Sequence, residues 1–277
     1  MSKIVFLILN YNSMQELVCC EKSIRENCTD YHIVVVDNGS KKEEVSELEA
    51  FCKEDPKITL LVNPENFGFA RGNNVGFRYI RENIDCDYIA MINSDTLIMD
   101  KSFTDLVDEA YKEYKFAVMG PDVLPSHSNP MINEPDSKEK VLKHIKETER
   151  QIRIMKIPGI NFLYLCINKI KVKLQSQKAS QITEPVVNCE LHGCFLIFSR
   201  LYRLDGLCDE TFLYGEEDLL AKACRDNGLT LLYYPKLKII HNESKATKKS
   251  MPDLIGRKLF FLNNRLDSYY VLLKKYE

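Results

Sequence analysis

Residues 32–40 read HIVVVDNGS, an apolar run that ends at an aspartate and an Asn-Gly turn. A continuous apolar run of this kind is typical of a strand that is buried on both faces, as in a parallel sheet covered by helices. The stretches KIVFLIL (residues 3–9) and YIAMINSD (residues 88–95) have the same apolar form, and each is followed by or ends in polar residues. We therefore expect three buried parallel strands that carry polar side chains at their carboxyl ends.

Helical spacing of apolar residues alternates with these strands through the first part of the chain. We predict helices over 13–27, over 41–53, up to residue 83 and over 102–114, with a further strand at 58–62. Ser13 and Glu16 are expected to form a capping box at the start of the first helix. Repeated β-α-β units predict an α/β fold with a mostly parallel sheet between helix layers, in which ligands bind beyond the carboxyl ends of the strands.

The pattern changes after Pro121. Residues 121–135 are expected to form a proline-marked loop, residues 137–156 a charged helix, residues 193–200 a strand, residues 214–228 a helix, residues 229–244 one or two short strands, and the tail from Asp253 a helix. We predict one domain over 1–245, with an insertion at about 121–187, and a C-terminal helical extension over 246–277.

The composition narrows the class of partner. The chain has 277 residues, 45% of them hydrophobic, and a formal net charge of -2, so nucleic acid is not an expected partner. Ten cysteines include no CxxC pair, which argues against a zinc ribbon and predicts a reducing, cytoplasmic location. The N-terminal apolar run is too short for a signal peptide, and no run of about 18 apolar residues predicts a membrane span.

The loops after the first strands admit more than one reading. LNYNSMQE follows the first strand without a glycine, which argues against the glycine-rich loops of NAD, flavin and P-loop sites. Asp37 is either a turn residue or a carboxylate that accepts hydrogen bonds from a base or a sugar. In NFGFARGNN (residues 66–74), Gly68 and Arg71 belong either to a flexible loop or to a surface that meets an anionic ligand.

Three further positions are candidates for chemistry. Asp95 either caps the next helix or binds a hard cation; the residues after it stay apolar until Ser102, which favours the cation. The acids at 216–218 in GEEDLL either complement a helix dipole or project a general base into a pocket. His241 ends an apolar run and is either structural or a second ligand for the same metal.

Taken in this order, the motifs resemble the inverting glycosyltransferases of family 2, which have a GT-A fold, and among them the rhamnosyltransferase-like enzymes of bacterial surface polysaccharide synthesis. The resemblance rests on ILNYN, VVVDNGS, NPENFGFARGNNVG, MINSD, the stretch from GCFLIFSR to YGEEDLL, and IIH. It covers residues 3–120 and 188–245. The resemblance implies a UDP- or dTDP-sugar donor, a divalent metal (Mg²⁺ or Mn²⁺) and a saccharide or lipid-linked acceptor.

The resemblance also implies a role for each polar cluster. Asp37 matches the residue that reads the uracil or thymine base. Asp95 matches the last position of the family's DXD metal motif, here NSD with Asn93 in place of the first acid, and His241 matches a histidine near the metal. The donor-binding residues implied in this way are Asn10, Tyr11, Asn12, Asp37, Asn38, Gly68, Arg71, Asn93 and Ser94.

The catalytic base is less directly matched. The family's acidic pair ED, whose aspartate is the base, is EED in this chain. Counting back without gaps from the Asn-Gly at the end of the helix places Glu217 at the base position, and Asp218 is the alternative, about 100° further around the helix. Two other classes compete with a transferase: a sugar-nucleotide pyrophosphorylase, which expects a glycine-rich basic loop after the first strand, and a non-catalytic nucleotide-sugar-binding protein.

Residues 150–178 combine large apolar side chains with lysines. This segment is either a helical insertion packed on the core or an interfacial helix whose lysines meet anionic lipid. The second reading predicts a peripheral contact with the inner face of the membrane.

Overall fold

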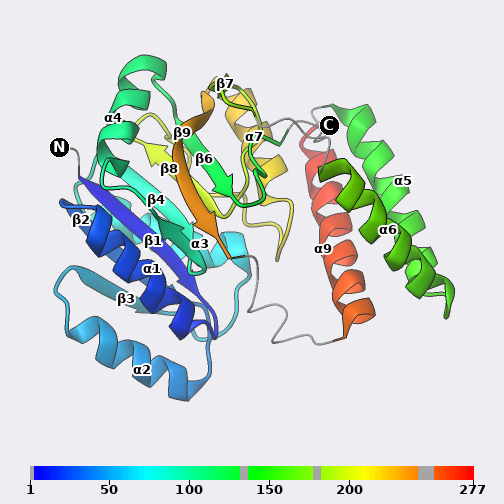
Figure 1. Cartoon of the computed structure of the whole chain (residues 1–277), viewed down its shortest axis with the longest axis horizontal. Coiled ribbons are helices and arrows are strands. Elements are labelled where there is room, and N and C mark those ends of the chain that lie inside the picture. The colour runs from blue at the N-terminus through cyan, green and yellow to red at the C-terminus, as the bar shows by residue number, and fades with distance from the viewer. Residues whose placement is uncertain (1–2, 132–136, 177–181, 243–252) are drawn as a thin grey trace.

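The computed structural model describes residues 3–131, 137–176, 182–242 and 253–277 (Figure 1). The strands are β1 (Ile4–Asn10), β2 (Tyr31–Asp37), β3 (Ile58–Val62), β4 (Tyr88–Asn93), β5 (Thr96–Ile98), β6 (Val118–Leu124), β7 (Val186–Val187), β8 (Phe195–Ser199) and β9 (Leu231–His241). The helices are α1 (Met14–Asn27), α2 (Lys42–Lys53), α3 (Phe69–Asn83), α4 (Phe103–Tyr114), α5 (Lys138–Met155), α6 (Ile160–Ser176), α7 (Glu216–Asp226) and α9 (Leu254–Lys274).

The strands form one sheet in the order β3-β2-β1-β4-β8-β6-β9-β5, and β7 pairs with β9 outside this order. The first four strands are parallel, β8 is antiparallel to β4 and β6, and β9 is parallel to β6 and antiparallel to β5. The α/β fold with a mostly parallel sheet is thereby confirmed. Because of these directions, the starts of β5 and β8 and the end of β9 lie at the same edge of the sheet as the carboxyl ends of β1, β2 and β4.

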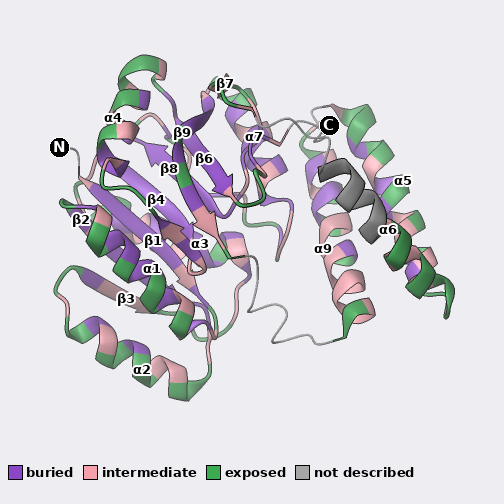
Figure 2. Ribbon diagram, in the orientation of Figure 1, coloured by how far each residue is buried: buried purple, intermediate pink, exposed green. Residues whose placement is uncertain are grey.

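The sheet divides the core into two layers, as the alternation along β1 shows. Ile4, Phe6 and Ile8 pack with side chains of α1 and α4, whereas Val5 and Leu7 pack with side chains of α3 and α7. All five side chains are fully buried, and β1, β2, β4 and β8 are coloured as buried along most of their length in Figure 2. A strand that is apolar on both faces therefore reflects helices on both sides of the sheet.

Two predicted boundaries are wrong. Pro121 lies inside β6 and not in a loop; the β6–β9 register shifts between Pro121 and Asp122, where a strand accepts proline. The loop after β3 is shorter than predicted, since α3 begins at Phe69 and Arg71 lies on its first turn. Of the one or two short strands predicted over 229–244, the structure has one, β9, and it is 11 residues long.

The helices α5, α6 and α9 form a separate layer beside the sheet (Figure 1). Val141 and Ile145 of α5 pack with Tyr269 and Leu272 of α9, and Tyr164 of α6 packs near Leu262 of α9 in a second cluster. The predicted insertion and the predicted C-terminal extension therefore contact each other. The predicted boundary at 245–246 lies outside the described residues, so the division into domains stays a prediction.

Among the described helices, none has both the length and the apolar character that crossing a bilayer requires. Helix α6 does expose apolar side chains to solvent, with Phe162 65% and Leu163 59% exposed. The cysteines are free thiols. Burial raises the pKa of Cys28 and Cys224 to about 12, so these thiols stay protonated and behave as small apolar side chains.

Candidate active site

A cavity of 710 Å³ lies between the carboxyl edge of the sheet and the helices α5 and α9. The sheet edge contributes Leu9, Tyr11, Asn93, Ser94, Asp95, His192, Gly193, Cys194 and His241 to its wall. The start of α7 contributes Glu216 and Glu217. The helical layer contributes, among others, His144, Glu147 and Gln151 of α5 and Phe261, Arg265 and Tyr269 of α9. The cavity thus lies where ligands bind in open α/β sheets.

Asp95 and His241 meet on this wall because β5 and β9 pair there. Thr96 is the register partner of His241, so Asp95, one residue earlier, lies beside the histidine ring. His241 Nε2 is 3.1 Å from Asp95 Oδ1, and the two side chains are only 12% and 15% exposed. The ring of His192 lies 5.8 Å from that of His241, centroid to centroid. The sequence analysis gave His241 as a possible second ligand for the metal of Asp95, and the structure brings the two side chains together.

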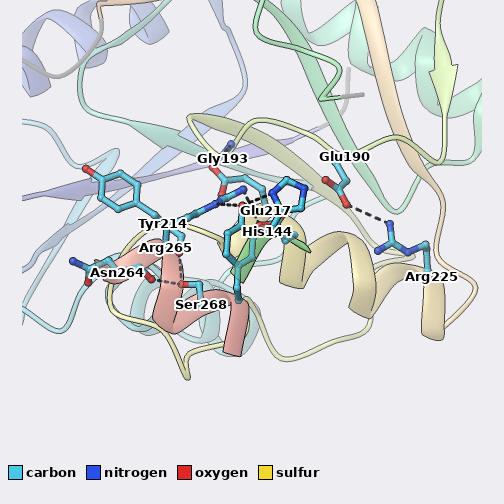
Figure 3. A network of polar contacts seen from close by, with 11 residues as sticks. His144, Glu190, Gly193, Tyr214, Glu217, Arg225, Asn264, Arg265 and Ser268 are labelled. Carbon is cyan, nitrogen blue, oxygen red and sulfur yellow. Dashed lines mark hydrogen bonds and ion pairs between the residues drawn. The ribbon is translucent and has the colours of Figure 1, made fainter. Parts of the chain in front are cut away.

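Glu217 faces the cavity from the first turn of α7. The backbone N–H of Gly193 donates a hydrogen bond to Glu217 Oε1 at 3.3 Å (Figure 3). A Cβ atom at position 193 would lie 3.0 Å from the same oxygen, tighter than an ordinary contact, so glycine leaves room for the carboxylate. The loop before β8 therefore orients Glu217 toward the space in front of the sheet edge.

Glu216 also lines the cavity, and it is the more deeply buried of the two neighbours. It is 5% exposed, and its Oε1 has no hydrogen-bond partner among the described residues. Burial, together with the adjacent charge of Glu217, raises the pKa of Glu216 to about 8, while Arg265 opposes the shift. At neutral pH the folded protein therefore favours the protonated form of Glu216.

Asp218, the alternative base, is held away from the cavity by α9. Arg265 Nη2 lies 3.0 Å from Asp218 Oδ2, and Asp218 is 1% exposed. Ser268 of α9 also donates a hydrogen bond to the carbonyl of Tyr214 (Figure 3). A side chain at Gly215 would clash with Ser268, so glycine there lets α9 approach α7 closely. Asp218 thus fixes α9 to the segment that carries the two glutamates.

Asn10 and Asp37 form a buried cluster behind the cavity wall. Asn10 Nδ2 donates to Asp37 Oδ1 at 3.0 Å and to Glu44 Oε1 at 3.1 Å, and the N–H of Ser40 donates to Asp37 Oδ2 at 3.0 Å. Both Asn10 and Asp37 are fully buried. Asn12 joins the same loop, because its N–H donates to Ser40 Oγ at 2.9 Å. These contacts fix the ends of β1 and β2 to each other.

The predicted capping box at Ser13 is wrong. The Ser13 hydroxyl makes no bond to the start of α1; it donates to Asn10 Oδ1 at 2.9 Å and lies 3.0 Å from Ser94 Oγ. Glu16, the other half of the predicted box, lines the cavity. Ser13 and Glu16 therefore line the cavity and do not form the predicted capping box, although α1 does begin at Met14.

Asn38 and Gly68 belong to a turn network that stabilises the loop before α3. Asn38 donates to Asn66 Oδ1 and to the carbonyl of Gly68, and it accepts from Asn63 Nδ2 and from the N–H of Phe67. Gly68 has a φ of 84°, and a Cβ there would lie 2.2 Å from the carbonyl oxygen of Phe212. Neither residue lines the cavity, and Arg71 is exposed on α3.

Several cavity residues were not found from the sequence. His192 precedes β8, whose start lies at the carboxyl edge only because that strand is antiparallel; the N–H of Asn93 bonds to the carbonyl of Cys194 there at 2.9 Å. His144 and Tyr269, whose side chains are 3.3 Å apart, come from helices without a motif. Glu216 was a candidate from the sequence only as one of the acids at 216–218, without a role of its own.

The donor set of Asp95 and His241 suits a divalent metal that a ligand completes. One carboxylate oxygen and one imidazole nitrogen are ligands that Mn²⁺ accepts, and a diphosphate and water fill the remaining positions in such sites. Within the described part of the chain, no group of three or more His, Cys, Asp or Glu is arranged to hold a metal. The protein alone therefore offers a partial site.

The fold is that of the GT-A transferases. A structure of GalNAc-T7 with UDP, GalNAc and Mn²⁺ has a TM-score of 0.58 with this chain at 13% identity, covering 87% of this chain and 44% of that one. The mannosyltransferase PcManGT from Pyrobaculum calidifontis, in complex with GDP-Man and Mn²⁺, also has a TM-score of 0.58 at 13% identity, covering 98% and 73%. At such low identity these likenesses show the fold.

The chain belongs to glycosyl transferase family 2, whose sequence model matches residues 5–202. It is similar to the low-salt glycan biosynthesis hexosyltransferase Agl10 of Haloferax volcanii, 26% identical over 137 residues, which are 49% of this chain and 41% of that protein. It is also similar to glycosyltransferase GlyG of Streptococcus pneumoniae, 23% identical over 122 residues, which are 43% and 39%. These alignments span less than half the length of either relative.

Proposed function

We propose that this protein transfers a sugar from a UDP- or dTDP-sugar to a hydroxyl of a saccharide or lipid-linked acceptor, with inversion at the anomeric carbon. The observation that supports this best is that Glu217 and the Asp95–His241 pair line the same cavity. A base on one side and a diphosphate-binding group on the other are what a single in-line displacement needs. More specifically, we propose that the sugar is rhamnose and that the product belongs to a surface polysaccharide.

In this proposal the nucleotide lies along the ends of β1 and β2. Tyr11, which is exposed at the cavity wall, offers a ring for stacking on the base. Asn93 and Ser94 offer polar groups to the rest of the donor. Asp37 and its partners act through the shape of the loop. Because Asp37 is fully buried, a direct bond from its carboxylate to the base requires the surrounding loop to move.

Asp95 and His241 hold the metal in this proposal. Bound there, Mg²⁺ or Mn²⁺ supplies positive charge that offsets the negative charge developing on the leaving diphosphate. The Mn²⁺ in the two structurally similar transferases supports this assignment. Asn93, which replaces the first acid of the family motif, leaves the site with fewer negative charges than a motif with two aspartates.

Glu217 is the proposed base. It accepts the proton of the acceptor hydroxyl as that oxygen bonds to the anomeric carbon, and the bond from this carbon to the diphosphate oxygen breaks with its electron pair. Glu216 favours its protonated form at neutral pH, so Glu217 is the neighbour left to take the proton. The ion pair between Asp218 and Arg265 argues against the alternative base.

The test is a donor panel of UDP- and dTDP-sugars, including dTDP-rhamnose, assayed with Mn²⁺ by release of the nucleotide. We expect turnover of at least one donor by the wild type. Replacing Glu217 with Gln should lower transfer by about 10²–10⁴-fold while UDP binding with Mn²⁺ persists. If Glu217→Gln keeps full activity and a folded Asp218→Asn is inactive, the base is misassigned; if the wild type binds donors but turns none over, the protein is a binding protein.

We also propose that the exposed face of α6 contacts an anionic membrane surface, where a lipid-linked acceptor would lie. Phe162, Leu163 and Ile167 are exposed large apolar residues on one helix. Residues 156–183 contain five lysines and no acidic residue. Exposed apolar side chains in a lysine-rich segment suit a surface of anionic lipid.

Co-sedimentation with vesicles of phosphatidylglycerol and phosphatidylcholine tests this contact. The wild type should bind, and the double variant Phe162→Asp/Leu163→Asp should not. Met99→Asp, which changes another exposed apolar side chain outside the helical layer, should bind like the wild type. Equal binding of the wild type and the double variant would remove the membrane from the proposal.

A further inference from the structure

The cavity has two chemically different halves. The sheet edge supplies Asp95, His241 and the serine and asparagine groups that the proposed function gives to the donor. The opposite half is formed by α5 and α9, and the proposed donor site does not use its residues. Glu217 lies on the wall between α7 and the sheet edge. When a hydroxyl of the acceptor reaches Glu217, the rest of the acceptor molecule therefore has the helical half of the cavity open to it.

The helical half combines an aromatic pair with hydrogen-bonding groups. The rings of Tyr214 and Phe261 lie 4.7 Å apart, centroid to centroid, and both residues line the cavity. Glu147 and Gln151, four residues apart on α5, offer polar groups from one helix face to the same space. A few polar groups placed around an aromatic surface are characteristic of small-molecule sites, and a sugar ring has both apolar faces and hydroxyls to match them.

The charged side chains that line this half argue against an anionic occupant. The positive charge of Arg265 is engaged by Asp218 at 3.0 Å, and its Nε donates to the hydroxyl of Tyr269 at 3.0 Å. The acids that line the cavity, Glu147 and Glu217 among them, would repel a carboxylate or a phosphate. A neutral ligand therefore fits this half better than a uronate or a phosphosugar.

Glu216 supplies an observation of another kind that points to a ligand. Its Oε1 is buried without a hydrogen-bond partner among the described residues, although the residue lines the cavity beside Glu217. A buried carboxyl oxygen without a partner destabilises the fold, and a ligand hydroxyl removes that penalty. Since Glu216 adjoins the proposed base, the hydroxyl that it binds would neighbour the one that reacts.

We propose that α5, α9 and Glu216 form the acceptor subsite, and that its ligand is a neutral pyranoside. One face of the sugar packs on Phe261, Glu147 and Gln151 bind its outer hydroxyls, and Glu216 binds the hydroxyl next to the attacking one. This inference rests on the proposed function, because it assumes that the sheet-edge half holds the donor. It adds the class of acceptor and the residues that select it.

Binding of methyl glycosides tests the subsite without knowledge of the natural acceptor. The probes are methyl glycosides of neutral hexoses and 6-deoxyhexoses, with methyl glucuronide for comparison, measured by saturation-transfer NMR in the presence of UDP and Mn²⁺. We expect a neutral glycoside to bind, and Phe261→Ala and Glu147→Gln each to weaken it by about tenfold. The UDP affinity of these variants should stay within about twofold of the wild type, because the aromatic pair lies outside the donor half.

Two matched controls use the outward sides of the same helices. Tyr270 of α9 and Glu149 of α5 bond to each other at 2.9 Å, and neither lines the cavity. Tyr270→Ala and Glu149→Gln should bind the glycoside like the wild type. The subsite is refuted if UDP binds with Mn²⁺ but no neutral glycoside does, or if Phe261→Ala and Glu147→Gln bind as tightly as the controls. Failure of UDP and dTDP to bind at all would refute the proposed function instead.

The part played by Glu216 is tested with deoxy analogues of the bound glycoside. Removing the hydroxyl that Glu216 binds should weaken binding to the wild type, whereas Glu216→Ala should bind the deoxy and parent glycosides equally well. If every deoxy analogue loses the same affinity in Glu216→Ala as in the wild type, Glu216 does not bind the acceptor.

Discussion

Asp37 and Asp95 are both aspartates at the carboxyl edge of one parallel sheet, yet their surroundings differ. Asp37 is fully buried, with its two carboxylate oxygens bonded to Asn10 and to the N–H of Ser40. Asp95 is 15% exposed on the cavity wall and lies against His241. A strand that ends in a carboxylate can therefore stabilise a loop or face a ligand, and the neighbours of that carboxylate distinguish the two roles.

The acids at the start of α7 divide in the same way. Asp218 is 1% exposed and forms an ion pair with Arg265. Glu217, one residue earlier, faces the cavity and accepts a hydrogen bond from Gly193. A fully buried acid whose partners lie inside the fold, such as Asp37 or Asp218, should affect stability when it is replaced, and an acid on the cavity wall should affect activity.

The largest expected effect is on activity. Replacing Asp95 with Asn should lower donor turnover by about 10²–10³-fold, because a neutral amide holds the metal ion next to the diphosphate less strongly than a carboxylate does. The free energy of unfolding should change by less than about 1 kcal/mol, since the residue lies on the cavity wall. Turnover with Mn²⁺ and chemical denaturation measure the two quantities. Loss of stability without loss of turnover would mean that Asp95, like Asp37, stabilises a loop and does not act on the donor.

The next effect is on stability. Asp218→Asn should lower the free energy of unfolding by about 3 kcal/mol, because it leaves Arg265, which is 13% exposed, without its charged partner. The control is Asp85→Asn, which breaks an ion pair with Arg200 whose side chains are 93% and 58% exposed. That change should cost about 0.5 kcal/mol or less. Equal effects of the two substitutions would contradict the role of Asp218 in fixing α9.

Glu216 should make stability depend on pH. Its pKa in the folded protein is about 8, raised from 4.5, so the unfolded chain releases this proton first and the folded state loses stability as pH rises between these values. Glu216→Gln cannot ionise, and relative to the wild type it should gain about 2 kcal/mol between pH 6 and pH 8. Thermal unfolding of both proteins at the two pH values measures the difference. A difference that does not change with pH would refute the assignment.

The smallest effect concerns Asp37. Asp37→Asn should lower the free energy of unfolding by about 1.5 kcal/mol. The NH₂ group of asparagine would face an N–H group whose hydrogen bond the carboxylate now accepts, so one donor would lose its acceptor. Any loss of turnover should be recovered at saturating donor if the residue acts only by shaping the loop. A fall in turnover that persists at saturation would mean that Asp37 contacts the donor directly.

The sequence predicted the parallel half of the fold well, because a buried strand shows its type in a continuous apolar run. Pro121 misled the prediction of β6, since the register shift that accommodates it depends on pairing with β9, more than 100 residues later. Glu217, Asp95 and His241 could be selected by motif. His144, Phe261 and Arg265 could not, because their place on the cavity wall depends on how two distant helices pack.

The most direct test of the account is where a metal binds. A crystal of the protein with UDP and Mn²⁺, measured at the manganese absorption edge, locates the ion by its anomalous signal. The account predicts a peak at coordination distance from Asp95 Oδ1 and His241 Nε2, with the diphosphate completing the site and Glu217 across the cavity. A manganese peak bound elsewhere, or UDP bound away from this cavity, would contradict it.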